Sequence, residues 1–348
     1  MQRLHFLLFM EMIFLTGAIH AQEVAPHYVS FSPEPRNENG VRVVFYNVEN
    51  LFDCKNDTLT KDEEFLPEGL YGWTSGKFFN KLQTIGKVLL SAGGWEPPEI
   101  IGLAEVENQS VVSLLAARLP LSPFGYKVVH YESPDTRGID VALLYRTDKF
   151  RVLYSAPLTV SLSEETQFHT RDILYVKGVV LNKDTLHLFV NHWPSKLGGE
   201  KLSRPHRMAA ARCLKRVVDS VMTNNPTARV LVMGDLNDVP SSPVVQSMLQ
   251  NERFSVNLMA TPLKKKDRGS YKFSGKWSVI DQIIVSSELL KKNGLHVKDG
   301  ACIFAPSFLL VPDEVFGGEK PFRSFLGPRY TSGYSDHMPV FVDLIYSK

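Results

Sequence analysis

Short apolar runs that end in polar residues recur along this chain. Residues 228–233 form one such run, followed by the polar stretch 234–238 and by 239–243, which contains two prolines. The pattern predicts a buried strand that ends abruptly and carries polar side chains at its tip. Asp235 and Asn237 lie two residues apart there, so in an extended chain their side chains point the same way.

The hydrophobic pattern predicts many strands and a few helices. Apolar residues spaced by three or four predict helices, and compact apolar runs bounded by polar residues predict strands. The predicted helices are residues 77–92, 108–119 and 208–221. The predicted strands are residues 41–46, 99–104, 126–130, 139–145, 150–154, 173–181, 186–190, 228–233, 279–285 and 338–342. The segments 53–76, 196–207 and 304–334 are expected to be loops, and a loop as long as the last is usually functional or mobile.

Composition sets broad bounds on the fold and its partners. The chain has 348 residues, 44% hydrophobic and 22% charged, which is enough for a large core in one or two domains. The formal net charge is only +2, so nucleic-acid binding would have to come from local basic patches.

Two segments offer such patches. Residues 196–207 contain several Lys and Arg residues and two glycines, and residues 264–276 interleave basic residues with Tyr271 and Phe273, just before Trp277. Basic and aromatic side chains together suit a nucleic-acid strand. A solvated surface explains the same residues equally well.

The N-terminus has the pattern of a secretory signal peptide. An apolar stretch at 4–18, broken by Glu11, precedes small residues at 18–21, which suggests cleavage after Ala21. A membrane anchor is the alternative, but the stretch is short for a span. We therefore expect a signal peptide at 1–21, a leader at 22–40, one domain at 41–346, no transmembrane segment after cleavage, and a secreted or periplasmic protein.

The cysteines do not form a metal-binding pattern. There are three, Cys54, Cys213 and Cys302, and an odd number leaves at least one thiol unpaired. An oxidising compartment permits a disulfide, but small buried thiols explain these residues more simply.

Polar residues lie at the ends of, or within, separate predicted strands. They are Asn47, Glu105, His192, Asp235, Asn237, Asp281, Asp336 and His337. Each has a structural explanation by itself, but if the fold gathers them, four carboxylates would repel one another without a divalent cation. Oxygen ligands favour Mg²⁺, with Mn²⁺ or Ca²⁺ as alternatives, over zinc. Together with two histidines, this set favours metal-assisted hydrolysis of a phosphate ester.

The same segments resemble the motifs of the endonuclease/exonuclease/phosphatase superfamily. In chain order they are residues 47–49, Glu105, residues 191–192, residues 234–237, Asp281 and residues 335–337. The resemblance covers about residues 41–346. It implies an α/β fold, a four-layer α/β/β/α sandwich of two mixed, mainly antiparallel sheets flanked by helices, with the site at one end of the sheets.

The resemblance implies a role for each matching position around the cation. Glu105 corresponds to the main metal ligand, with Asn47 and Asp336 close to the ion. His337 corresponds to the group that activates the attacking water, and Asp281 to the residue that orients it.

The remaining positions concern the substrate. Asp235 and Asn237 would position water and phosphate, and His192 would stabilise the transition state or protonate the leaving oxygen. By their place in the chain, Asp140 would orient His192 and Arg171 would hold the phosphate. Glu49 falls where the family varies and receives no role.

We therefore predict a secreted, divalent-metal-dependent phosphodiesterase, with nucleic acid as substrate and without a stable protein partner, acting as a monomer. The first alternative is a phosphatase or phosphodiesterase acting on lipid head groups, inositol phosphates or small nucleotides. The second is a catalytically inactive relative that serves as a binding protein. Loops set the substrate in such folds, so the motifs do not choose between them.

Overall fold

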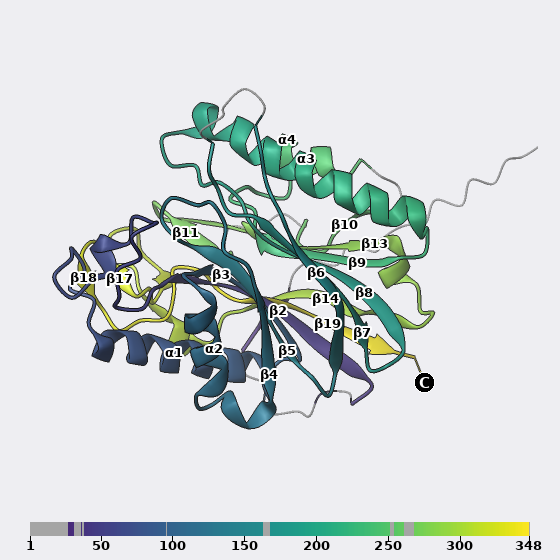
Figure 1. Cartoon of the computed structure of the whole chain (residues 1–348), viewed down its shortest axis with the longest axis horizontal. Helices are drawn as coiled ribbons and strands as arrows, with labels where there is room; N and C mark the ends of the chain where they lie inside the picture. Colours follow the sequence, from purple (N-terminus) through teal and green to yellow (C-terminus); the bar gives the residue numbers. More distant parts are fainter. Residues whose placement is uncertain are drawn as a thin grey trace, which may run out of the picture.

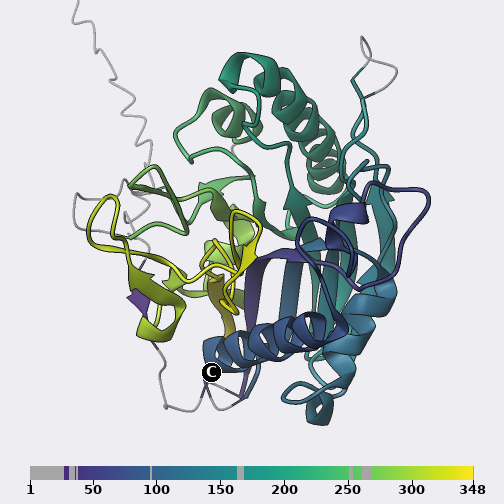
Figure 2. The ribbon, with the colours of Figure 1, turned by 90° about the vertical axis from the view of Figure 1, so that its left-hand side faces the viewer.

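The computed structural model describes residues 27–30, 36, 38–94, 96–162, 168–250, 254–260 and 268–347. Two large sheets pack face to face, and helices cover the outer face of each (Figures 1 and 2). This arrangement confirms the predicted four-layer sandwich. The predicted signal peptide lies outside the described residues.

The first sheet has seven strands in the order β1-β14-β19-β2-β3-β5-β4. Their bounds are β1 His27–Val29, β2 Gly40–Leu51, β3 Ile100–Val106, β4 Tyr126–His130, β5 Asp140–Arg146, β14 Leu295–Phe304 and β19 Val340–Tyr346. Helices α1 (Ser75–Gly93) and α2 (Gln109–Ala117) cover its outer face. The apolar side of α1, including Leu82, Ile85 and Leu89, is buried, as its spacing predicts.

The second sheet has six strands in the order β10-β13-β9-β8-β7-β6. Their bounds are β6 Phe150–Leu158, β7 Ile173–Val180, β8 Asp184–His192, β9 Arg229–Asp235, β10 Phe254–Asn257 and β13 Asp281–Ser286. Helices α3 (Glu200–Asn224) and α4 (Pro243–Met248) lie on its outer face.

Three short hairpins and several 3-10 helices lie outside the two large sheets. The hairpins are β11 (Tyr271–Phe273) with β12 (Lys276–Ser278), β15 (Leu310–Pro312) with β16 (Glu319–Pro321), and β17 (Phe325–Leu326) with β18 (Arg329–Tyr330). Short 3-10 helices span Glu63–Phe65, Ser122–Phe124, Ser287–Leu290 and Ser307–Leu309. No helix of the described part of the chain is long and apolar enough to cross a membrane.

The two sheets pack closely in the core beside Gly102, where an added Cβ would displace the flexible end of the Met233 side chain. A Cβ at Gly102 on β3 would lie 2.8 Å from the terminal carbon of Met233 on β9. Burial of apolar side chains between the sheets, at about 25 cal/mol per Å², is the main force holding them together. The strand ends are thereby fixed against one another.

The strand directions bring the polar tips to one edge. β2 runs parallel to β3, and β8 parallel to β9, with His192 paired with Asp235. β13 runs antiparallel to β9, so Asp281 at its start pairs with Asp235 at the end of β9. Because the carboxyl ends of parallel strands share an edge, residues distant in sequence become neighbours.

Regular structure occurs within the predicted loops and within the predicted leader. Helix α3 begins at Glu200, so the predicted loop at 196–207 is wrong from that residue on; buried Arg207 bonds with Asp238 and holds the first turns in place. Within the predicted leader, His27–Val29 forms β1 and pairs with β14. The segment 304–334 contains two of the hairpins.

Candidate active site

The carboxylate of Asp235, at the end of β9, is the centre of the site. Its Oδ2 accepts a hydrogen bond from Asn47 Nδ2 at 3.1 Å and lies 3.8 Å from His192 Nε2 and 3.7 Å from His337 Nε2. These neighbours come from β2, β8 and the segment before β19, so both sheets contribute. Burial raises the pKa of Asp235 to about 7, although nearby His337 acts in the opposite direction.

A glycine permits this strand end to pack. A Cβ at Gly234 would lie 2.4 Å from the backbone oxygen of Asn191 on the adjacent strand β8. No side chain fits there, which explains the glycine of the Gly-Asp-Leu-Asn motif.

A bulge directs Glu105 into the same site. The register between β3 and β5 shifts at Glu105, which has a left-handed φ of 63°. Bulges re-aim single side chains in this way. Its Oε1 accepts a hydrogen bond from Asn47 Nδ2 at 3.1 Å and lies 3.7 Å from His192 Nε2. Glu105 and Asp235 therefore converge on the same amide and the same imidazole.

His337 is held between two carboxylates. Its Nδ1 lies 2.8 Å and 3.0 Å from the oxygens of Asp281, which is fully buried, while its Nε2 faces Asp235. The ring of Tyr271 on β11 lies 4.8 Å from the imidazole, centroid to centroid. Burial lowers the pKa of His337, but Asp281 and Asp235 outweigh it, so the pKa lies well above its usual value.

His192 has the opposite electrostatic environment. It is buried, and burial lowers its pKa well below the usual value, with Arg171 and Arg137 acting in the same direction. Its Nδ1 is buried and has no hydrogen-bond partner among the residues described. A neutral imidazole with the proton on Nε2, facing the carboxylates, satisfies both observations.

Asn47 holds the two carboxylates together. Its Nδ2 donates to Glu105 and Asp235, and its Oδ1 accepts from the backbone nitrogen of Glu49 at 3.0 Å. This orientation turns the amide nitrogen, and not the oxygen, toward the centre. The geometry therefore favours a positioning role for Asn47 over the predicted role as a metal ligand.

Asn237 and Asp336 flank the centre. Asn237, with a left-handed φ of 49°, donates from Nδ2 to the backbone oxygen of Trp193 at 2.9 Å, and its backbone nitrogen bonds with Asp235. Asp336 lies with Oδ1 3.9 Å from His337 Nε2 and remains partly exposed.

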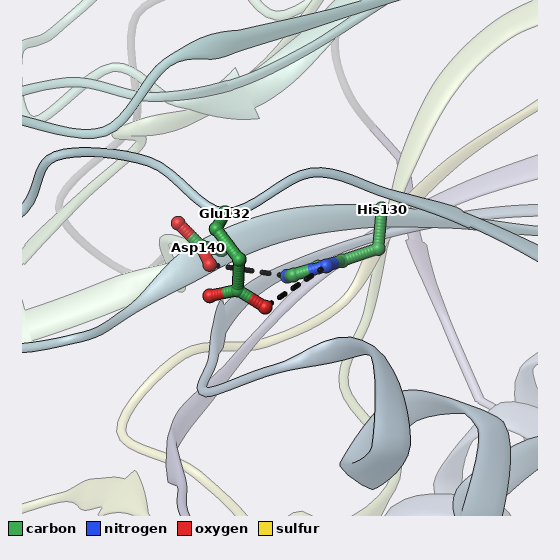
Figure 3. Close-up of side chains that lie close together, drawn as sticks. All are labelled: His130, Glu132 and Asp140. Carbon is green, nitrogen blue, oxygen red and sulfur yellow. Dashed lines mark hydrogen bonds and ion pairs between the residues drawn. The ribbon is translucent and has the colours of Figure 1, made fainter. Parts of the chain in front are cut away.

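Asp140 does not orient His192. Its carboxylate lies 3.1 Å from His130 Nε2 and accepts hydrogen bonds from the backbone and hydroxyl of Ser133. Figure 3 shows Asp140 and Glu132 together on one side of the His130 imidazole, with Glu132 3.7 Å from its Nδ1. The prediction for Asp140 is wrong because β4 supplies a second histidine beside it.

Arg171 is not free to hold a phosphate as predicted. It is buried, and its guanidinium donates to Asp135 at 2.8 Å, to the backbone oxygen of Trp193 at 2.7 Å and to that of His192 at 3.2 Å. Arg171 therefore fixes the end of β8 and, with it, His192.

A second set of charged residues adjoins the site and was not assigned from the sequence. Glu49 and Lys81 are buried, and Arg323 bonds with Glu49 and with Asp336. Glu49 could have been suspected from the sequence, because it follows Asn47 by two residues at the end of a strand. Lys81 lies on the apolar face of α1, and the hydrophobic pattern of the sequence does not predict a buried cation there.

Several basic residues of the two predicted segments are paired with acids. Lys272 bonds with Asp313 at 2.6 Å, and Arg268 pairs with Glu319. Lys196 lies 2.9 Å from Asp238. Residues 264–266 lie outside the described part of the chain. Lys201, Arg204 and Lys276 are exposed.

The donor set fits a hard divalent cation. Among the described residues, Glu105 and Asp235 have no Lys or Arg partner, and the imidazole that they share is held neutral by burial. Asp235, Asp281 and His337 also place one ligand atom each within 4.8 Å of one another. Glu105 is the carboxylate left without a cationic partner, because His337 faces Asp235 and Asp281, and such a group beside a buried site favours a bound cation.

Family comparison agrees with this geometry. The family described as "Endonuclease/Exonuclease/phosphatase family" matches residues 42–346. The chain belongs to this family. Its members are metal-dependent phosphoric ester hydrolases, and the chain is an enzyme of that class.

Solved structures show the same fold at low identity. An endonuclease/exonuclease/phosphatase family protein from Bacteroides thetaiotaomicron has a TM-score of 0.55 and 16% identity, covering 88% of this chain and 98% of its own. The mannosyl-6-phosphatase of the same organism has a TM-score of 0.52 and 16% identity, covering 88% and 100%. Humanized D. rerio TDP2 has a TM-score of 0.53 and 14% identity, covering 88% and 99%. No curated protein sequence matches the chain.

Proposed function

We propose that this enzyme is a divalent-metal-dependent phosphodiesterase that hydrolyses nucleic acid by attack of an activated water. The observation that carries the proposal is the convergence of two imidazoles of opposite character on one carboxylate oxygen. His192 Nε2 and His337 Nε2 lie 3.8 Å and 3.7 Å from Asp235 Oδ2. A general base, His337, and a hydrogen-bond donor, His192, that share the carboxylate of Asp235 suit in-line displacement at phosphorus.

Glu105 and Asp336 would hold the cation, with Mg²⁺ the ion best suited to carboxylate oxygens. Mn²⁺ and Ca²⁺ take the same oxygen ligands. A bound divalent cation neutralises charge that develops on the phosphate oxygens. Asn47 keeps Glu105 and Asp235 in place by donating to both.

His337 is the general base in this proposal. In the neutral form of the ring, Nδ1 donates to Asp281 and Nε2 is the acceptor on the side of Asp235. Asp281 and Asp235 stabilise the imidazolium that forms when Nε2 takes a proton from water. The raised pKa of His337 reflects this stabilisation.

His192 is the donor. Because burial keeps it neutral, its Nε2–H can donate a hydrogen bond to a phosphate oxygen or to the leaving oxygen without adding a fixed charge. The imidazole keeps this proton, and the leaving oxygen takes its proton from water. Arg171 fixes its backbone. Asp235 orients the water, and Asn237 contacts the phosphate, as their positions in the motif imply.

Nucleic acid as substrate is supported by aromatic side chains at the rim. Tyr271 packs on His337, and Phe273 of the same hairpin is 69% exposed. Exposed aromatic rings bind unpaired bases by stacking. The predicted signal peptide supports an exported enzyme that meets nucleic acid outside the cytoplasm.

A second candidate is hydrolysis of a small phosphorylated molecule. The ion pairs of Lys272 with Asp313 and of Lys196 with Asp238 favour it, because they neutralise two of the basic side chains that a long polyanion would contact. A solved neighbour is titled a mannosyl-6-phosphatase.

A substrate panel tests the proposal. The mature chain with Mg²⁺ is assayed on single-stranded and double-stranded DNA, RNA, bis-p-nitrophenyl phosphate, sphingomyelin, inositol phosphates and a sugar phosphate. We expect cleavage of nucleic acid and of the diester, abolished by chelator and in His337→Ala. Cleavage confined to the sugar phosphate or inositol phosphates would select the second candidate.

A further inference from the structure

Arg323 reaches the active site from the segment between β14 and β19. Its Nε donates to Glu49 Oε1 at 3.0 Å, and its Nη2 lies 3.0 Å from that oxygen and 3.2 Å from Asp336 Oδ2. Its side chain remains 42% exposed, whereas that of Glu49 is 3% exposed. Its Nη1 has no hydrogen-bond partner among the residues that the structure describes.

A buried network of hydrogen bonds holds this arginine in position. The backbone nitrogen of Ser324 donates to Glu49 Oε2 at 2.6 Å. Beneath it, Lys81 Nζ donates to the hydroxyl of Ser324 and, at 2.7 Å, to the backbone oxygen of Tyr334. Lys81 and Ser324 are both fully buried. Both oxygens of Glu49 are thus bonded to residues 323 and 324.

An aromatic cluster holds the surrounding segment. The ring of Phe325 lies 5.6 Å from those of Trp73 and Tyr330, and 4.8 Å from that of Tyr71. Trp73 in turn donates to the backbone oxygen of Phe52. These contacts fix the chain directly after Arg323, so the guanidinium is presented by a rigid support.

Arg323 lies close to His337, the proposed general base. Asp336 bridges the two, with Oδ2 3.2 Å from Arg323 Nη2 and Oδ1 3.9 Å from His337 Nε2. The guanidinium and the imidazole thus approach the two oxygens of the same carboxylate, and a phosphate bound beside His337 Nε2 has Arg323 as a near cationic neighbour.

We propose that Arg323 is the phosphate-binding residue of the site, which donates from Nη1 to the non-bridging oxygens of the substrate phosphate. Nε and Nη2, bonded to Glu49 and Asp336, hold the planar guanidinium in this orientation, whereas a lysine offers only a flexible point charge. Arg171, buried and bonded to two backbone oxygens, leaves this role open. The inference rests on the proposed phosphoesterase chemistry and assigns its substrate contact.

Binding of inorganic phosphate tests the contact apart from catalysis. Calorimetry with Mg²⁺ compares the wild type with Arg323→Ala, Arg323→Lys and the control Arg329→Ala. Arg329 is an exposed arginine of β18 in the same segment, so its removal subtracts the same charge. We expect Kd for phosphate to rise about tenfold in Arg323→Ala, less in Arg323→Lys, and not in Arg329→Ala.

Steady-state kinetics separates binding from support. In Arg323→Ala we expect KM for the best ester of the panel to rise by a similar factor, with kcat changed by less than about threefold. A KM and a phosphate Kd equal to those of the wild type would overturn the proposal, as would equal losses in Arg329→Ala. If Arg323→Ala does not fold, Arg323→Lys gives the decision. A wild type inactive on every ester would defeat the proposed function, whereas unchanged binding in active variants defeats only the role of Arg323.

Discussion

Asp235 and Asp281 face each other as a cross-strand pair of β9 and β13, and His337 contacts both with its two ring nitrogens. Two buried carboxylates in register would normally repel. The imidazole between them compensates their charge and is in turn fixed in one orientation. This arrangement makes Asp281 the residue on which the basicity of His337 depends.

Asp281→Asn is therefore expected to reduce kcat by about 10²-fold to 10⁴-fold while the protein stays folded. Loss of the carboxylate lowers the pKa of His337, so the acidic limb of the pH profile of kcat/KM moves to lower pH. Rates on bis-p-nitrophenyl phosphate from pH 5 to 9 measure both effects. An unchanged acidic limb would argue against His337 as the base.

Glu105→Gln is expected to weaken metal binding. The variant removes one negative charge from the pair that Asn47 holds together. The Mg²⁺ concentration for half-maximal activity should rise at least tenfold, and direct titration with Mn²⁺ should show the same loss. Glu96→Gln serves as control, because Glu96 is an exposed carboxylate that pairs with Arg146 and not with a residue of the site. Equal metal affinities in both variants would remove Glu105 from the site.

Arg171→Ala is expected to destabilise the fold as well as the site. Its removal leaves the buried carboxylate of Asp135 without its partner, which costs about 3 to 5 kcal/mol. Urea unfolding should show this loss. Arg137→Ala removes a half-exposed arginine 3.6 Å from the same carboxylate and should cost less than about 1 kcal/mol. Similar stabilities would contradict the assigned contacts.

His187 predicts how stability responds to acid. It lies on β8 with Nδ1 2.7 Å from the hydroxyl of Tyr175. Burial, with Lys177 acting in the same direction, lowers the pKa of His187 to about 4. Because the folded pKa lies below the unfolded one, the folded state binds fewer protons. The stabilisation is therefore complete above the unfolded pKa and is lost as the pH falls toward 4, by about 3 kcal/mol at most. Unfolding of His187→Asn should depend less on pH between 7 and 4 than that of the wild type; equal slopes would refute this.

The sequence alone predicted which residues lie at strand ends. Periodicity placed α1 and α2 within a few residues, because an apolar stripe and an N-cap such as Asn108 are local features. It also identified seven residues that the structure gathers around one centre. They are Asn47, Glu105, His192, Asp235, Asp281, Asp336 and His337.

The local sequence pattern predicted structure and contacts less well where they depend on residues far apart in the chain. The first turns of α3 looked like a basic loop, since their stabilising partner Asp238 lies after the next strand. Asp140 and Arg171 were matched to the site by their order in the chain. Only the fold shows that His130 and Asp135 lie closer to them.

The sequence by itself determined the set of chemical groups and the strands that carry them. The reason is that the pattern of apolar and polar residues and the side-chain types are local properties of the sequence. What only the tertiary structure decided is which of those groups face one another. Hydrogen-bond partners such as Glu49 and Arg323, 274 residues apart, are set by strand register and sheet packing. These depend on the burial of the whole core and on no single segment of the chain.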